Sequence, residues 1–129
     1  MNTELKLLTF SIVLGFVQLF SGVIATTAVR GQKWNMGNRE GNEPPLHGMP
    51  ARLNLAFENF KETFPFFAAA VLLVFAAGRF SSTTALGAQL YFFARLAYVP
   101  VYAAGIPGLR SVIWLVSVVG IALVVGALL

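Results

Sequence analysis

A first stripe of polar side chains interrupts an apolar segment in the middle of the chain. Arg52, Asn59 and Glu62 are spaced seven and three residues apart, so a helix places them on one face. Only about 16 apolar residues follow Glu62, which leaves this carboxylate at the edge of any membrane-spanning part of the helix. Charges at such a depth face protein partners or serve a function.

A second stripe follows, because Tyr91, Arg95, Tyr98 and Tyr102 recur at spacings of four, three and four residues. Arg95 lies inside an apolar segment, where an unpaired charge costs several kcal/mol. Two interpretations stay open. Glu62 and Arg95 form a structural ion pair that holds two helices in register, or both belong to a binding site. A place in the aromatic belt at the membrane interface is also open for Tyr102.

Arg30 and Arg110 border two further apolar segments and add guanidinium groups at the same end. Guanidinium groups bind carboxylates bidentately, whereas a carboxylate such as Glu62 accepts an ammonium or amide N–H. These residue types suit a small zwitterionic ligand with net negative charge. The chain has no Ser–His pair, cysteine or Gly-rich phosphate loop, so the available catalysis is electrostatic, with an arginine stabilising an anion.

Composition indicates the environment of these stripes. The 129 residues suffice for one domain, and 57% are hydrophobic while 11% are charged, against about 25% charged in soluble domains. The chain is therefore an integral membrane protein that contacts membrane lipid. Its nine Lys and Arg are spread singly between apolar runs, which excludes a nucleic-acid partner. A single histidine, His47, and no cysteine exclude a metal site.

The apolar runs predict an all-α membrane protein, a bundle of four transmembrane helices forming a single domain over residues 1–129. The expected helices cover about residues 5–30, 50–78, 81–104 and 109–129, with one long loop at 31–49. Ser81 or Ser82 is expected to cap the third helix. Pro65 and Pro100 fall inside helices, where they kink rather than end them.

Basic residues predict the orientation. Five of them flank the first and third loops and two lie on the opposite side. The five are Arg30, Lys33, Arg39, Arg52 and Arg110, and the two are Lys6 and Arg79. Because basic residues accumulate in cytoplasmic loops, we expect loops one and three in the cytoplasm and both termini outside. In a bacterium this would be the cell inner membrane.

Three segments carry a resemblance to a known family. Residues 59–67 read NFKETFPFF and look like an N-x-x-E-x-x-P-F motif, residues 95–102 follow R-x-x-Y-x-x-x-Y, and Arg110-Ser111 opens the last helix. With the length and the expected helices, the chain resembles the membrane-associated proteins in eicosanoid and glutathione metabolism (MAPEG). The similarity covers nearly the whole chain.

The resemblance implies a homotrimer of four-helix protomers that binds glutathione, as a co-substrate, between subunits near the cytoplasmic face. It implies that Asn59 and Glu62 hold the glutathione peptide, that Arg30 and Arg52 grip its carboxylates, and that Arg110 is the catalytic residue that favours the thiolate. The full set implied to bind glutathione is Arg30, Arg52, Asn59, Glu62, Tyr98, Tyr102 and Ser111. The expected function is a glutathione-dependent transferase or peroxidase acting on lipophilic electrophiles from the bilayer.

Departures from the family pattern keep alternatives open. Leu55 stands where glutathione-using members usually carry an arginine, and Trp114 stands where some carry a tyrosine. Leu55 favours a non-catalytic accessory member that binds a lipid or a thiol, whereas the retained Arg110, Asn59 and Glu62 favour catalysis. A small multidrug exporter is a remote alternative, because such exporters carry an acidic residue where this chain has Gln18.

Overall fold

The computed structural model describes residues 2–39, 41 and 43–129, and within these ranges the chain forms four long helices, one short helix and no strand. The helices are α1 (Thr3–Arg30), α2 (Gln32–Met36), α3 (Gly48–Ala77), α4 (Ser82–Ala104) and α5 (Pro107–Gly126). The predicted all-helical class is confirmed.

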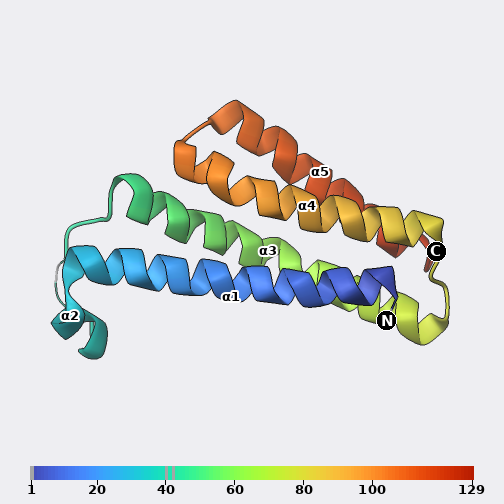
Figure 1. The fold of residues 1–129 in the computed structure, drawn as a ribbon, viewed down its shortest axis with the longest axis horizontal. Coiled ribbons are helices and arrows are strands. Elements are labelled where there is room, and N and C mark those ends of the chain that lie inside the picture. The colour runs from blue at the N-terminus through green and yellow to red at the C-terminus, as the bar shows by residue number, and fades with distance from the viewer. Residues whose placement is uncertain (1, 40, 42) are drawn as a thin grey trace.

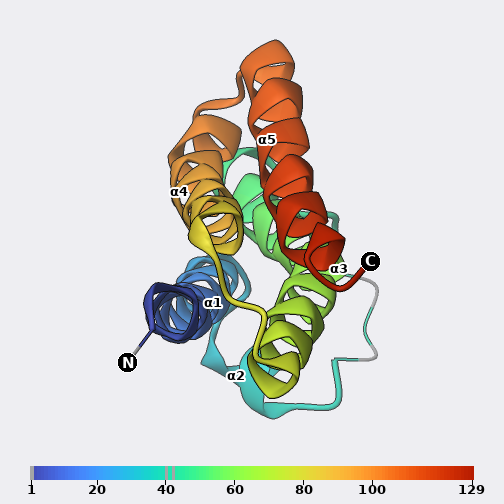
Figure 2. The same ribbon diagram turned by 90° about the vertical axis from the view of Figure 1, so that its right-hand side faces the viewer.

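The four long helices run alternately in opposite directions along one axis (Figure 1). Both termini and the α3–α4 turn lie at one end, whereas the α1–α3 connection and the α4–α5 turn lie at the other. The view along the bundle in Figure 2 shows α4 beside α5, and the closest packing is that of α4 on α5, followed by α1 on α3. Loops one and three therefore share one end of the molecule.

Short local signals set the helix boundaries. Gly78 and Gly105 follow α3 and α4 with φ of 68° and 75°, a left-handed conformation that costs glycine little. Ser81 begins α4 with a capping box, in which its side chain and that of Thr84 bond each other's backbone N–H groups. Pro107 occupies the first turn of α5, where its missing N–H costs nothing.

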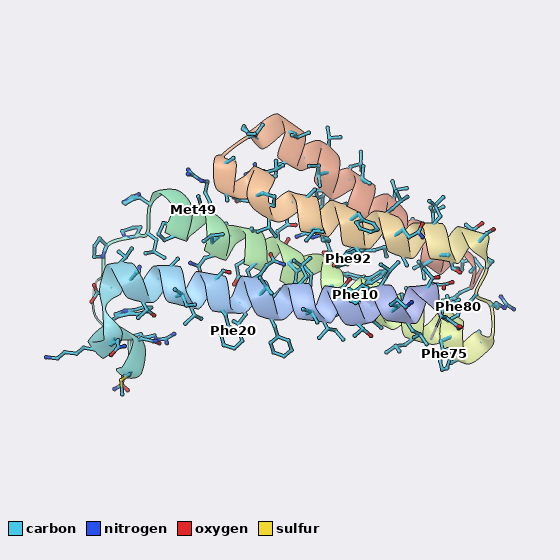
Figure 3. All side chains as sticks on the ribbon, in the orientation of Figure 1. Phe10, Phe20, Met49, Phe75, Phe80 and Phe92 are labelled. Atoms are coloured by element: carbon cyan, nitrogen blue, oxygen red, sulfur yellow. The ribbon has the colours of Figure 1, made fainter. Side chains whose placement is uncertain are left out.

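The apolar core fills the half of the bundle nearest the termini. Its buried members come from all four long helices: Leu7, Leu8, Phe67, Ala70, Val71, Val74, Ala88, Tyr91 and Val124. The rings of Phe67 and Tyr91 stack with centroids 4.1 Å apart. Nearer the core's edge, Phe10 and Phe92 meet between α1 and α4 at 6.0 Å (Figure 3). Tyr91 of the second polar stripe thus belongs to this core, and the other members of the two stripes lie beyond it, toward the α4–α5 turn.

Two glycines bring the α4 and α5 backbones together. A Cβ on Gly120 would lie 2.5 Å from the carbonyl oxygen of Gly87 and 2.7 Å from the backbone nitrogen of Tyr91. A Cβ on Gly87 would lie 2.6 Å from the carbonyl oxygen of Gly120. Since real Cβ contacts are essentially never below 3.0 Å, this crossing requires glycine on both helices and fixes α5 against α4.

The long helices expose many large apolar side chains on their outer surface. Phe20, for example, points away from the bundle and is 58% exposed (Figure 3). By length and composition, α1, α3 and α5 can each cross a membrane. The expected fourth span, α4, is not among these candidates, because Gln89, Arg95 and three tyrosines reduce its hydropathy.

The connection between α1 and α3 contains a short helix, α2, where an irregular loop was expected. Trp34 on α2 stabilises it, because the guanidinium groups of Arg30 and Arg39 each lie 4.7 Å from its ring centroid. Arg39 also donates a hydrogen bond of 3.0 Å to the Asn35 carbonyl. The aromatic ring thus contacts two cations near the end of α1.

Candidate functional site

The main polar feature of the structure is a cavity of about 580 Å³ between α3, the second half of α4 and the start of α5. We call it the polar groove. Its lining residues are Leu55, Glu58, Asn59, Glu62, Tyr98, Tyr102, Arg110, Ser111, Trp114 and Leu115. Six of the residues predicted to surround a ligand therefore gather in one place: Asn59, Glu62, Tyr98, Tyr102, Arg110 and Ser111.

Helix geometry explains this gathering. Asn59 and Glu62 are three residues apart on α3, and Tyr98 and Tyr102 are four apart on α4, so each pair shares a helix face. The turn at Gly105 then reverses the chain, which brings the first residues of α5 back beside the end of α4. As a result, Arg110 lies with its guanidinium carbon 4.6 Å from the centroid of the Tyr102 ring.

The groove contains one guanidinium group and two carboxylates. Arg110 is half-buried against Tyr102, and it is the one cation among the lining residues. Glu58 is engaged by Lys61, whose ammonium lies 2.7 Å from Oε1, whereas Glu62 is exposed to the groove. The groove therefore presents one free carboxylate at one side and one guanidinium at the other, which suits a zwitterionic ligand.

Arg95 lies directly beneath this surface. Its side chain is 1% exposed, its Nη1 donates a hydrogen bond of 2.8 Å to Asn59 Oδ1, and its guanidinium lies 4.2 Å from the Tyr98 ring centroid. Of the two interpretations left open for Glu62 and Arg95, the ion pair is not formed: within the described part of the chain the salt bridge on α3 is that of Lys61 with Glu58. Arg95 reaches α3 one turn before Glu62, which faces outward instead.

The other two predicted arginines lie outside the polar groove. Arg52 donates from Nε to the Ala103 carbonyl at 2.8 Å and so ties the start of α3 to the end of α4. Arg30 donates to the Pro44 carbonyl at 3.0 Å while stacking on Trp34. A carboxylate in the groove therefore meets Arg110 but neither of these two side chains.

An apolar cavity of about 780 Å³ continues from the polar groove along α3 and α5, and we call it the apolar groove. The two grooves share Glu62 and Trp114 in their linings. From there the apolar groove extends past Phe66 and Leu73 toward Leu128, near the opposite end of the bundle. A charged ligand head and an apolar molecule could therefore meet where the grooves join.

Four lining residues were not among the predicted ligands: Leu55, Glu58, Trp114 and Leu115. Leu55 lies four residues before Asn59 and seven before Glu62, and these spacings predict that the three share one helix face. Glu58 directly precedes Asn59. Leu115 follows Ser111 by four residues on α5. Trp114 follows Ser111 by three residues, so the helical repeat could have identified Leu55, Trp114 and Leu115, whereas Glu58 lies at the margin of the face.

In a comparison with family models, the model of the MAPEG family matches residues 7–129, nearly the whole chain. The comparison with curated proteins finds no match to this chain. The matched range includes every residue of the polar groove.

Proposed function

The chain belongs to the MAPEG family, and on this premise we propose that it is a glutathione-dependent transferase or peroxidase acting on lipophilic electrophiles. The observation that supports this most is that Asn59, Glu62 and Arg110 line one groove that opens into an apolar cavity. Such an arrangement holds a polar thiol at one place and offers it an apolar partner from the lipid.

We assign roles to polar side chains that line the groove. Asn59 and Glu62 hold the peptide of glutathione, and Tyr98, Tyr102 and Ser111 complete the wall of the site. Arg110 faces the sulfur and favours the thiolate, since a nearby cation lowers a thiol pKa from its usual value of about 8.5. The thiol proton leaves to water, the sulfur lone pair forms a bond to the electrophilic carbon, and the leaving group departs with its electron pair.

We further propose that the protein is a homotrimer and that all four long helices cross the membrane. The polar groove opens on the outside of the protomer, with Glu62 exposed at the edge of an apolar surface, and a polar group in lipid needs protein cover. A neighbouring subunit would supply that cover and also its Arg30. α4 has 23 residues, about 34 Å, and keeps Arg95 buried.

The charge distribution supports loops one and three in the cytoplasm and the termini outside. Crosslinking in native membranes tests the assembly: trimers are expected, and a ladder that ends at monomers or dimers contradicts the homotrimer.

A second function, a non-catalytic accessory protein that binds a thiol or a lipid, is favoured by Leu55. This leucine lines the polar groove, where glutathione-using relatives usually carry an arginine, and Arg52 does not replace it. Turnover separates the two functions, because the accessory protein would bind without conjugating.

The experiment is conjugation of glutathione to an apolar electrophile by the protein reconstituted in lipid. Arg110→Ala is expected to slow the reaction by about 10²–10³, the usual effect of removing one electrostatic stabiliser of an anion. The matched control is Arg39→Ala, an arginine of the α1–α3 connection that bonds Asn35 and lies outside the groove. If the wild-type protein shows no turnover, the proposal of an enzymatic function is contradicted, and the accessory function is the one that remains.

A further inference from the structure

In the part of the chain that the structure describes, only one of the three guanidinium nitrogens of Arg95 donates a hydrogen bond to the protein around it. Nη1 donates to Asn59 Oδ1, whereas Nε and Nη2 have no partner within the described residues. The charge also has no carboxylate partner there, since the salt bridge on α3 joins Lys61 and Glu58. The guanidinium is held instead by the rings of Tyr98 and Phe60, with centroids 4.2 Å and 5.9 Å away.

This contact fixes the orientation of the Asn59 amide. A guanidinium carries donors and no acceptor, so the atom of Asn59 that faces Arg95 has to be the oxygen. The amide nitrogen, with its two N–H donors, is then left for other partners. Asn59 is half-buried and lines the polar groove, and no protein acceptor for its Nδ2 is found among the described residues.

We propose that Arg95 is a positioning residue that commits Asn59 to donating hydrogen bonds into the polar groove, and thereby sets the direction in which a peptide-like ligand lies. Asn59 then takes a carbonyl or carboxylate oxygen, and Glu62, one turn along α3, takes an N–H or an ammonium. Without the contact to Arg95, the Asn59 amide could rotate and present either its oxygen or its nitrogen to the ligand. The inference rests on the proposed function for the identity of the ligand, but not for the orientation of Asn59.

Stability alone would favour a different residue at this position. A carboxylate would accept from Arg95 as the amide oxygen does and would also neutralise a buried charge. Aspartate, however, has no donor to offer the groove. An asparagine beside an unpaired buried arginine is therefore the arrangement expected when a donor toward the ligand matters more than stability.

Asn59→Asp tests this directly, because the stability of the protein and its affinity for glutathione are expected to change in opposite directions. We expect the midpoint of thermal unfolding to rise, because Arg95 gains an anionic partner. We expect the glutathione Kd to rise about tenfold or more, because the ligand oxygen loses its donor and faces a carboxylate. A role that was only structural would leave the affinity unchanged.

Asn54→Asp is the matched control on the same helix. Asn54 uses its nitrogen within the protein, donating to Thr26 Oγ1 at 2.8 Å and to the Pro50 carbonyl at 2.7 Å. Here the same substitution removes both donors, so the midpoint of unfolding is expected to fall while the glutathione Kd stays the same. The opposite stability shifts of the two variants would show that the two amides point their nitrogens in different directions.

The possible failures are distinguishable. An Asn59→Asp variant that melts below wild type, or does not fold, means that the nitrogen faces the protein, and it overturns the inference. A variant that is stabilised and binds glutathione as wild type does overturns it as well. Wild-type protein that does not bind glutathione overturns the proposed function, whereas the unfolding midpoint of Asn59→Asp still decides how Asn59 is oriented.

Discussion

Gly120→Ala is expected to separate α4 from α5 and to destabilise the protein. The new Cβ would lie 2.5 Å from the Gly87 carbonyl oxygen and 2.7 Å from the Tyr91 nitrogen. Both obstacles are backbone atoms, so no side chain can rotate away. The closer contact must lengthen by about 0.9 Å to reach the 3.4 Å of ordinary van der Waals contact. Overpacking of this kind costs about 1–3 kcal/mol.

The displacement should also reach the polar groove. Arg110 lies ten residues before Gly120 on the same helix, about 15 Å along its axis. A shift of α5 at the crossing therefore changes the position of Arg110 relative to Tyr98 and Tyr102 on α4. We expect slower turnover as well as lower stability.

Thermal unfolding in detergent, followed by tryptophan fluorescence, measures the effect, and Trp114 on α5 is a local reporter. Gly126→Ala is the control, because its Cβ would have no heavy atom within 4 Å and the residue is also in α5. If Gly120→Ala unfolds within about 0.5 kcal/mol of wild type, as a surface substitution does, the close crossing is refuted.

Three further substitutions test the polar contacts. Thr84→Val removes the hydroxyl that donates at 2.6 Å to the buried Glu4 carboxylate. The free energy of unfolding should therefore fall by about 1–3 kcal/mol, and an unchanged midpoint of thermal unfolding would contradict that hydrogen bond. Glu62→Gln should weaken glutathione binding in calorimetry about tenfold while leaving the unfolding midpoint unchanged. A loss of about 3–5 kcal/mol would instead show that Glu62 is one partner of a buried ion pair. Leu55→Arg adds a guanidinium to the polar groove and should tighten glutathione binding about tenfold, and weaker binding would mean that the ligand carboxylates lie elsewhere.

Periodicity and local signals sufficed to predict the helices and the faces of their polar stripes. The spacing of Asn59 and Glu62, and that of Tyr98 and Tyr102, placed each pair on one side of a helix, and the structure brings both pairs into the polar groove. Ser81 caps α4 as expected. These features depend on residues within a few turns of one another, which is the range over which sequence spacing is informative.

The errors concern contacts between helices. Spacing predicts a face but not how far one helix slides along another, so it left a Glu62–Arg95 pair open and did not predict that Arg95 bonds Asn59, one turn away. The direction of Arg52 could not be predicted either, because its partner is a backbone carbonyl, that of Ala103, which has no sequence signature. The stacking of Arg30 and Arg39 on Trp34 depends on the short helix α2, which is too short to show a period.

The central claim is that Arg110 stabilises the thiolate of glutathione in the polar groove. The most direct measurement is the near-ultraviolet absorbance of the thiolate when glutathione is added to purified protein at neutral pH. We expect a thiolate signal with the wild type, and with Arg110→Ala a higher apparent thiol pKa and a weaker signal, at a glutathione Kd changed only modestly. Lost binding with an unchanged thiol pKa in the residual complex, or no thiolate signal in the wild type, would contradict the claim.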